Sequence, residues 1–340
     1  MVNKMIIRLG YVAISKALNI TSSGTITYTN YLKEENKNEK LDKIIKLNLE
    51  NLEKILNYNA KNNIHFYRLT SKLIPLATHK DISFEYINKY KDYYDKISKI
   101  IDKNNMRVDV HPDQFCVLNS TNKETINNSI EILKYHINIL EALKIKNPVI
   151  VLHTGSSVFG KEKSITRFVN NFNKLPDNIK NSIVIENDDK IYNAKDVLSL
   201  CKKINRPMVL DYHHHICNPC DNIDDILGEI FDTWKDIRPK IHFSSPKNKT
   251  KRDFRSHHDY INSDDSDEEN ISWDLICIAM RSVADTCVIP VQDFLGLDES
   301  ARINTPSTLG DNWKWRMTLG CFSQELIDKI KRLTKIYGRI

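Results

Sequence analysis

Histidine and carboxylate side chains recur in this sequence at the ends of short apolar runs. Four successive runs end at His111, His153, Glu186 and Asp211, and the next run carries His242. One histidine alone is more often a core or surface residue than a ligand, but five such positions in succession favour a shared site. Imidazole and carboxylate ligands together suit Mn, Zn or Fe ions. The pattern therefore predicts a metal centre.

Metal ions held close together suit the hydrolysis of a phosphodiester, because one ion activates a water molecule while another stabilises the leaving oxygen. Sugar isomerases and epimerases also place metal ions at the mouth of a barrel. The ligand pattern by itself therefore leaves the substrate open.

The stretch Asp211–Cys220, DYHHHICNPC, offers other chemistry as well. Cys217 and Cys220 have the C-x-x-C spacing of a zinc knuckle or a redox dithiol. However, the sequence has no second cysteine pair at zinc-finger distance, and the two cysteines follow a strand instead of opening a helix. We therefore interpret the stretch as the end of an apolar run, with Asp211 as its candidate ligand and three histidines following it.

Eight apolar runs rich in β-branched residues would position these side chains. They are MIIRLGY (5–11), IHFYRLT (64–70), MRVDVHP (106–112), PVIVLHTG (148–155), SIVIEND (182–188), RPMVLDY (206–212), PKIHFSS (239–245) and TCVIPVQD (286–293). Segments of helical period lie between them, for example at 41–63, 87–105 and 123–145. Alternation of this kind predicts a parallel sheet, and eight repeats predict a closed (β/α)8 barrel of the TIM type. A doubly wound open sheet is the alternative, although no G-x-G-x-x-G follows the first run.

In such a barrel the carboxyl ends of all strands meet on one face, where active sites form. Residues two positions apart on a strand share a face. Val149 and Val151 therefore point the same way as His153, and Lys240 points the same way as His242. The alternation places the reactive side chains together at the mouth of the barrel.

The overall composition is that of a globular protein. With 340 residues, 41% of them hydrophobic, the chain can form one large barrel. The net charge of +6 permits nucleic-acid binding without demanding it. No apolar run approaches the roughly 20 residues that a membrane span needs, and the N-terminal run makes a poor signal peptide. With seven cysteines, an odd number, we expect a cytoplasmic protein that has reduced thiols and no membrane partner.

Several longer stretches, over about residues 5–261, resemble the UV damage endonucleases. The matching stretches are IRLGY, FYRLTSKLIPLATH, VDVHPDQF, VIVLHTG, VIENDD, VLDYHHHICNP, PKIHFSS and HHDYI. The resemblance implies a barrel related to endonuclease IV that cuts DNA immediately 5′ of UV photoproducts and of some other lesions. It also implies a cluster of two or three divalent metal ions, with Mn²⁺ expected and Zn²⁺ or Mg²⁺ as alternatives.

The ligand set that this resemblance implies is larger than the strand pattern alone gives. It comprises His79, His111, His153, Glu186, Asp211, His214, His242 and His257. The residues to which it assigns catalysis are Glu186, Lys240 and His242. Two interpretations of Lys240 stay open: a carboxylated lysine near the metal ions, or an ion-paired lysine of the barrel.

The resemblance also implies residues that contact the lesion or the DNA backbone. They are Tyr11, Ser15, Arg68, Gln114 and Phe115. Ser15 and Phe115 depart from the family pattern, in which Asn and Tyr are expected. Phe115 keeps a flat ring for stacking on an unpaired base, and packing at the mouth or in the core is the alternative for Phe115 and Tyr11. Lys72 and the basic run at 245–255 could hold phosphates.

The last part of the chain resembles a different family. Residues 262–340 match the C-terminal end of amylomaltase, a 4-alpha-glucanotransferase, through PVQDFLGL, ARINTPSTLGDNWKWR and ELIDKIKRLTKIYGR. We therefore expect two regions, 1–261 with seven strands and 262–340 with a foreign eighth strand and a C-terminal helix. The nuclease family ends its last strand in a metal-binding glutamate, whereas the nearest candidates here are Gln292 and Asp293. The metal cluster is expected to lose one ligand unless Asp293 substitutes.

Three hypotheses about function follow. The first is a monomeric, metal-dependent DNA repair endonuclease that acts on double-stranded DNA containing cyclobutane pyrimidine dimers or 6-4 photoproducts. It would leave a 3′-hydroxyl and a 5′-phosphate. The second is a sugar isomerase or epimerase that binds a small substrate in a narrower mouth. The third is an inactive or weakened DNA-binding chimera.

Overall fold

The computed structural model describes residues 10–15, 17–247, 254–257, 273, 276–277, 280, 288–297, 299–301, 314–318 and 320–336. The chain divides into two compact units. We call Arg8–Phe243 the barrel unit, and we call the other, which combines Met1–Ile7 with Ser244–Ile340, the tail unit.

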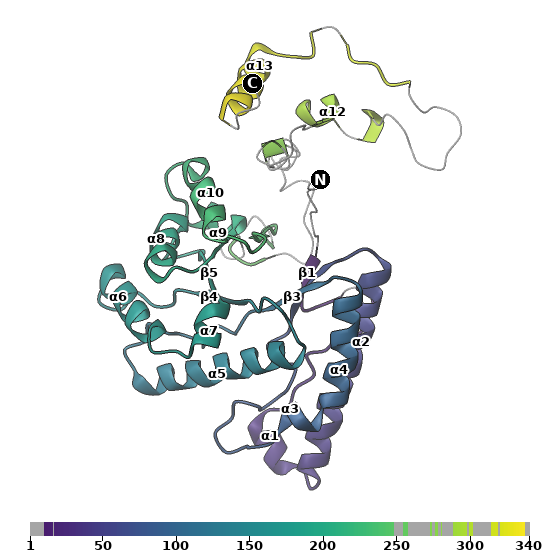
Figure 1. Cartoon of the computed structure of the whole chain (residues 1–340), viewed down its shortest axis with the longest axis vertical. Coiled ribbons are helices and arrows are strands. Elements are labelled where there is room, and N and C mark those ends of the chain that lie inside the picture. The colour runs from purple at the N-terminus through teal and green to yellow at the C-terminus, as the bar shows by residue number, and fades with distance from the viewer. Residues whose placement is uncertain are drawn as a thin grey trace. The chain divides into compact units, whose positions relative to one another are not determined.

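Seven short parallel strands form the sheet of the barrel unit (Figure 1). They are β1 (Gly10–Val12), β2 (Phe66–Leu69), β3 (Arg107–Val110), β4 (Ile150–His153), β5 (Ile183–Glu186), β6 (Met208–Asp211) and β7 (Ile241–His242). Each strand pairs with the next strand along the chain, in the order β1-β2-β3-β4-β5-β6-β7. Parallel strands in sequential order with helices between them are the pattern of a TIM-type barrel, so the predicted fold class is confirmed.

Helices connect the strands and cover the sheet. They are α1 (Tyr28–Lys33), α2 (Lys37–Lys61), α3 (Tyr86–Lys89), α4 (Lys91–Lys103), α5 (Lys123–Ala142), α6 (Lys161–Phe172), α7 (Asp177–Ser182), α8 (Ala194–Ile204), α9 (Tyr212–Cys217) and α10 (Ile223–Asp232). The helix predicted at 87–105 is two helices, because Tyr90 leaves helical geometry at φ −110° and ψ 23°. The long helix α2 buries Leu41, Ile45, Leu49 and Leu52, which recur every three or four residues.

The central strands are buried on both faces, as expected for a parallel sheet that helices cover. All four residues of β5 and all four of β6 are buried. Glu186 and Asp211 therefore stand at the ends of otherwise apolar strands, at 1% and 0% exposure. Charged side chains this deeply buried need partners close by.

The predicted eighth strand is wrong in the part that the structure describes. Residues 288–290 have no regular structure, and Val291–Phe294 form a helical turn, α12, that contains Gln292 and Asp293. Pro290 precedes this turn, and a proline cannot donate a ladder hydrogen bond, whereas its fixed φ suits a helix start. The first residues of the run, 286–287, lie outside the described part of the chain.

The tail unit has a small apolar cluster of its own. Trp273, Ile276 and Met280 are buried, and Ile289, Phe294, Leu326, Ile330 and Leu333 pack against them. Leu326, Ile330 and Leu333 belong to α13 (Gln324–Ile336), so the predicted C-terminal helix is confirmed. A 3-10 turn at Glu299–Ala301 lies between α12 and α13 in the sequence. None of the helices described is both long enough and apolar enough to cross a membrane.

Candidate metal centre

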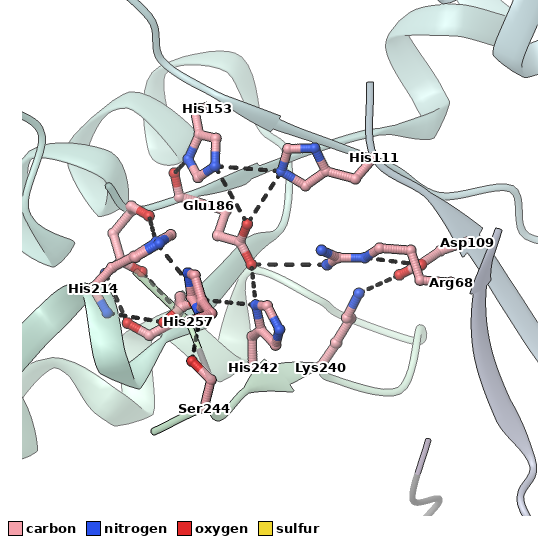
Figure 2. A network of polar contacts seen from close by, with 12 residues as sticks. Arg68, Asp109, His111, His153, Glu186, His214, Lys240, His242, Ser244 and His257 are labelled. Carbon is pink, nitrogen blue, oxygen red and sulfur yellow. Dashed lines mark hydrogen bonds and ion pairs between the residues drawn. The ribbon is translucent and has the colours of Figure 1, made fainter. Parts of the chain in front are cut away.

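The strand ends of the barrel unit bring most of the predicted ligands together. His153 and Glu186 are neighbours across β4 and β5, and Asp211 and His242 are neighbours across β6 and β7. His111 follows β3 directly. Figure 2 shows the side chains of His111, His153 and His242 directed toward the carboxylate of Glu186. The predicted convergence is therefore present in the structure.

The first ligand group consists of His111, His153 and Glu186. The Nε2 atoms of the two histidines are 3.3 Å apart. Glu186 Oε2 lies 3.4 Å from Nε2 of His111 and 3.7 Å from Nε2 of His153. An ion with tetrahedral bonds of about 2.1 Å holds its ligands roughly 3.4 Å apart. The spacing of the three atoms therefore fits a metal ion.

The histidine tautomers support the same assignment. Nδ1 of His111 faces the carbonyl oxygen of Pro112 at 2.6 Å, Nδ1 of His153 faces that of Glu186 at 3.3 Å, and Nδ1 of His214 faces that of Asn187 at 2.8 Å. A carbonyl can only accept, so each Nδ1 carries a proton, and a ring without a second proton has its lone pair on Nε2. Burial lowers the pKa of His153 despite the attraction of Glu186, which keeps that ring neutral. When both rings are neutral, the lone pairs of His111 and His153 face the carboxylate oxygen of Glu186. These three electron-rich atoms repel one another, and a cation bound among them would stabilise the arrangement.

The second ligand group consists of Glu186, Asp211 and His242. Nδ1 of His242 lies 2.7 Å from Asp211 Oδ2 and 3.3 Å from Glu186 Oε1. Burial alone would lower the pKa of His242, but hydrogen bonding to Asp211 and Glu186 outweighs burial and raises the pKa to about 9. A metal ion that uses this nitrogen must therefore displace a proton.

Two buried carboxylate oxygens of the centre are incompletely satisfied. Glu186 Oε1 and Asp211 Oδ2 accept no hydrogen bond of good geometry in the structure, apart from their close ion-pair contacts. Burial would raise the pKa of Glu186, but contacts with His111 and His242 and the charge of Arg68 hold it well below its usual range. Both carboxylates are therefore charged, and each has one buried oxygen with ion-pair contacts but no well-formed hydrogen bond, as fits a metal ligand before it binds an ion.

A layer of charged residues lies behind Glu186. Arg68 Nη2 is 3.8 Å from Glu186 Oε1, and Arg68 Nε is 3.5 Å from Asp109 Oδ1. Lys240 forms an ion pair with the other oxygen of Asp109, and its ammonium lies 4.7 Å from the ring centre of Phe66. Burial lowers the pKa of Lys240 to about 8, although Asp109 opposes this shift. The contacts are those of an ion-paired barrel lysine, one of the two interpretations of Lys240 that the sequence left open.

Two residues of the site were missed by the sequence analysis. Asp109 is fully buried between Arg68 and Lys240, and Asn187 is fully buried between β5 and β6. A signal for Asp109 was present, because it is the one charged residue inside the run VDV and shares a strand face with His111. No spacing in the sequence distinguishes Asn187 from the aspartates that follow it.

Two further predicted ligands, His79 and His257, and the tail residue Gln292 have contacts of their own. His79 belongs to none of the groups found among the described residues; its ring stacks on Tyr28 at 3.9 Å, and its Nδ1 accepts a hydrogen bond from the backbone of Asp81 at 3.3 Å. His257 is in the tail unit, where it is exposed and its Nδ1 hydrogen-bonds to Ser244 Oγ. Gln292, also in the tail unit, donates to the carbonyl of Ala301 at 3.1 Å. The ligand roles of His79 and His257 stay predictions.

The predicted DNA-contacting residues differ in exposure. Tyr11 is half-buried, and its hydroxyl donates to Asn59 Oδ1 at 2.8 Å. Ser15 is buried, whereas Gln114 is exposed and Phe115 exposes 68% of its surface. Lys72 is exposed in the turns after β2, and the greater part of the basic run at 245–255 lies outside the described residues. Cys217 and Cys220 are not joined by a disulfide, and Cys217 Sγ lies 3.8 Å from His213 Nε2.

The fold and the site together define a (β/α)-barrel protein with a candidate metal centre at the carboxyl ends of its strands. The family model for the UV-endonuclease UvdE matches residues 7–288, and the chain belongs to this family. The predicted endonuclease class is therefore confirmed.

Individual relatives agree with the family assignment. UV DNA damage endonuclease from Bacillus cereus (strain B4264) is 39% identical over 264 residues, which cover 76% of this chain and 83% of that protein. The protein of the same name from Bacillus thuringiensis subsp. konkukian (strain 97-27) is 40% identical over 264 residues, which again cover 76% of this chain and 83% of that protein. The crystal structure of SacUVDE matches 80% of this chain and 89% of its own, with 35% identity and a TM-score of 0.72. The predicted boundary at residue 261 and the amylomaltase-like tail stay predictions.

Proposed function

We propose that this protein is a metal-dependent DNA repair endonuclease that incises the backbone immediately 5′ of UV photoproducts. The observation that carries the proposal is the meeting of Nε2 of His111, Nε2 of His153 and Oε2 of Glu186 within 3.3–3.7 Å of one another. Neutral rings with that geometry are built to hold a cation. Family membership adds the endonuclease class, and the relatives' names add UV-damaged DNA as the substrate.

The residues divide into holders and supports of the metal ions. His111, His153 and Glu186 hold one metal ion. Asp211, His214 and His242 are ligands in a second part of the centre. His79 and His257 are further ligands that the family resemblance implies. When bound, divalent ions, Mn²⁺ first among them, supply an activated water molecule and stabilise the leaving oxygen. Glu186 belongs to both groups, because Oε2 faces the first and Oε1 faces His242.

Cationic side chains balance the charge that a phosphate brings to the centre. Arg68 and Lys240 stand beside Glu186 and share Asp109 between them. Desolvated cations at such a position stabilise a phosphate whose negative charge increases during attack. Together with Glu186 and His242, Lys240 is therefore a candidate catalytic residue.

The proposed contacts with the substrate include two exposed residues near the candidate metal centre. Gln114 and Phe115 follow β3, the strand that leads to His111. An exposed aromatic ring next to a nuclease centre suits stacking on a base that damage has loosened. Tyr11, which is half-buried within β1, and Ser15, which is buried after it, complete the set of predicted lesion contacts.

The test is nicking of supercoiled plasmid with and without prior UV irradiation, in the presence of Mn²⁺. We expect relaxed circles from irradiated plasmid only, and none with Glu186→Gln. An end-labelled duplex with one defined photoproduct locates the cut, and extension by a polymerase identifies a 3′-hydroxyl. If metal analysis and unfolding curves show a folded, loaded protein that nicks neither plasmid, the proposal is wrong. Ketose–aldose exchange without DNA cleavage would favour the sugar isomerase hypothesis instead.

A further inference from the structure

The barrel unit exposes apolar side chains mainly on the loops that follow its strands. Among the described residues of this unit, the exposed large hydrophobic side chains are Val12, Ile14, Leu32, Leu47, Phe115, Val158, Phe159, Ile216 and Phe243. Apart from Leu32, Leu47 and Ile216, which lie on α1, α2 and α9, all of them end a strand or lie in the segment that follows one. Exposed aromatic residues gathered on one functional face indicate a contact surface.

Phe159 is the most exposed of these side chains, with 74% of its surface accessible. It lies on the loop between β4 and α6, which begins directly after His153. Its backbone has φ 65°, in the left-handed region that a bulky side chain rarely adopts. The left-handed backbone and the exposure of an aromatic ring to water each cost free energy. A ligand that contacts the ring would account for both.

The loop is held rigidly despite this strain. The backbone N–H of Gly160 donates to the carbonyl of Ser157 at 2.8 Å and closes a turn with Phe159 inside it. From α6, Arg167 Nη2 donates to the carbonyl of Val158 at 2.7 Å, and Ser164 Oγ donates to the same carbonyl at 3.0 Å. The ring of Phe159 therefore projects from a fixed base, so little conformational entropy is lost when a ligand covers it.

The same anchors tie this loop to the loop that carries Phe115. Asn119 Oδ1 accepts from the backbone N–H of Ser156 at 2.9 Å, and Asn119 Nδ2 donates to the carbonyl of Ser156 at 2.7 Å. Arg167 Nε also donates to the carbonyl of Asn119 at 3.0 Å. Phe115 and Phe159 are thus displayed by two loops of fixed relative position, on consecutive β/α connections.

We propose that Phe159 is a second nucleobase-stacking residue, which contacts a base exposed in the damaged duplex beside the base that Phe115 meets. A flat, exposed ring has few partners in DNA other than a base, because the phosphates and sugars offer no flat apolar surface. Lys163, in the first turn of α6, is exposed and can meet a phosphate, whereas Lys161 pairs with Asp196 at 2.6 Å and Glu162 lies between the two lysines, so the ring supplies most of the proposed contact. This inference rests on the proposed action on damaged DNA, and it adds a residue that the family resemblance did not supply.

The experiment measures equilibrium binding of a labelled duplex with one defined photoproduct, with Ca²⁺ in place of Mn²⁺ to suppress cleavage. We expect Phe159→Ala to weaken binding about tenfold, a typical effect of losing one stacked base. Phe159→Trp should bind with the affinity of the wild type. Phe159→Leu, which is apolar but not flat, should bind as weakly as Phe159→Ala. Leu47→Ala, on α2, is the matched control because Leu47 is also exposed, at 55%, and its variant should bind as the wild type does.

A spectroscopic readout distinguishes stacking from a structural role. The indole fluorescence of Phe159→Trp, measured as the difference from wild type, should be quenched on addition of the damaged duplex, because stacking on a base quenches it. Equal affinities of Phe159→Ala and wild type would overturn the inference while leaving the proposed function intact. A wild type that binds damaged and undamaged duplex alike would overturn both. Loss of self-association in Phe159→Ala, with unchanged DNA affinity, would assign the ring to a protein contact and also overturn it.

Discussion

Asn187 and Asp211 exchange two hydrogen bonds across the ends of β5 and β6. The backbone N–H of Asp211 donates to Asn187 Oδ1 at 2.8 Å, and Asn187 Nδ2 donates to the carbonyl of Asp211 at 2.9 Å. The carbonyl of Asn187 also faces Nδ1 of His214 at 2.8 Å. One buried amide residue therefore fixes the position of a carboxylate and the tautomer of a histidine in the candidate centre.

Asn187→Ala should weaken metal binding more than it weakens the fold. Residues that orient ligands typically change metal affinity by about 10–100-fold when they are removed. The measurement is a calorimetric titration with Mn²⁺, beside a urea unfolding curve of the metal-free protein. Asn51→Ala is a suitable control, because Asn51 is also buried and donates to the carbonyl of Thr21 at 2.8 Å. If both variants bind Mn²⁺ like the wild type, Asn187 is only a structural residue.

Asp109→Asn should destabilise the barrel unit strongly. Asp109 is fully buried and is paired with both Arg68 and Lys240, so the change leaves two desolvated cations without their shared carboxylate. Breaking a buried ion pair from one side typically costs about 3–5 kcal/mol. The free energy of unfolding in urea measures this cost. Adding Lys240→Met should recover part of it, because the second change removes one of the stranded charges.

The control for Asp109 is an exposed ion pair. Asp177→Asn removes the partner of Lys180 on the surface of α7, where Asp177 is 87% exposed. Exposed pairs contribute little to stability, so this variant should unfold almost like the wild type. A destabilisation of Asp109→Asn no larger than that of Asp177→Asn would show that the Arg68–Asp109–Lys240 cluster is not a structural support.

His136 should make the fold sensitive to acid. Burial lowers the pKa of His136 from 6.5 to about 3, with a smaller contribution from His111 nearby. Between those values the unfolded chain takes up a proton that the folded chain does not, so stability is complete above pH 6.5 and falls as the pH decreases. Between about pH 7.5 and pH 5 the loss from this residue is about 2 kcal/mol. His136 lines a cavity of about 170 Å³, and the charged residues Lys72 and Asp113 line the same cavity.

The measurement for His136 is a series of urea unfolding curves at several pH values. His136→Gln should remove this part of the acid sensitivity, although other groups will keep some dependence on pH. Two parallel curves of stability against pH, for wild type and variant, would contradict the expected titration.

Removing divalent metal should both stop cleavage and lower the melting temperature. Glu186 and Asp211 are charged and buried side by side, so an ion that binds only the folded state adds stability, about 2.7 kcal/mol at a concentration of 100 Kd. Treatment with a chelator followed by Mn²⁺ should reverse both effects in the wild type. In Glu186→Gln the melting temperature should not respond to Mn²⁺. Glu229→Gln, which changes a surface partner of Lys202, should respond like the wild type.

The sequence predicted the parts of the fold that depend on local pattern. Seven apolar runs became seven strands, because alternation within each run and a helical segment after it are local properties. The ligands at the strand ends were also predictable, since parallel strands deliver their last residues to one face. The eighth run failed because Pro290 favours a helix start over a strand, and that competition is decided by the fold of the tail.

The supporting residues were not predictable for a different reason. Asp109 pairs with Lys240, 131 positions along the chain, and Asn187 pairs with Asp211, 24 positions along. Such partnerships depend on the relative shift of strands that a single sequence does not reveal. His79, whose motif implies a ligand, stacks its ring on Tyr28, and its ligand role stays a prediction.

Glu186 gives the candidate centre a property that its separate ligands do not have. Its Oε2 faces His111 and His153, and its Oε1 faces His242. An ion bound to one side fixes the carboxylate for the other, so the two halves of the centre are thermodynamically linked. The affinity of one half for a metal ion should therefore depend on whether the other half is occupied. A change at His242 should then alter metal binding at His111 and His153, although neither of these residues has changed.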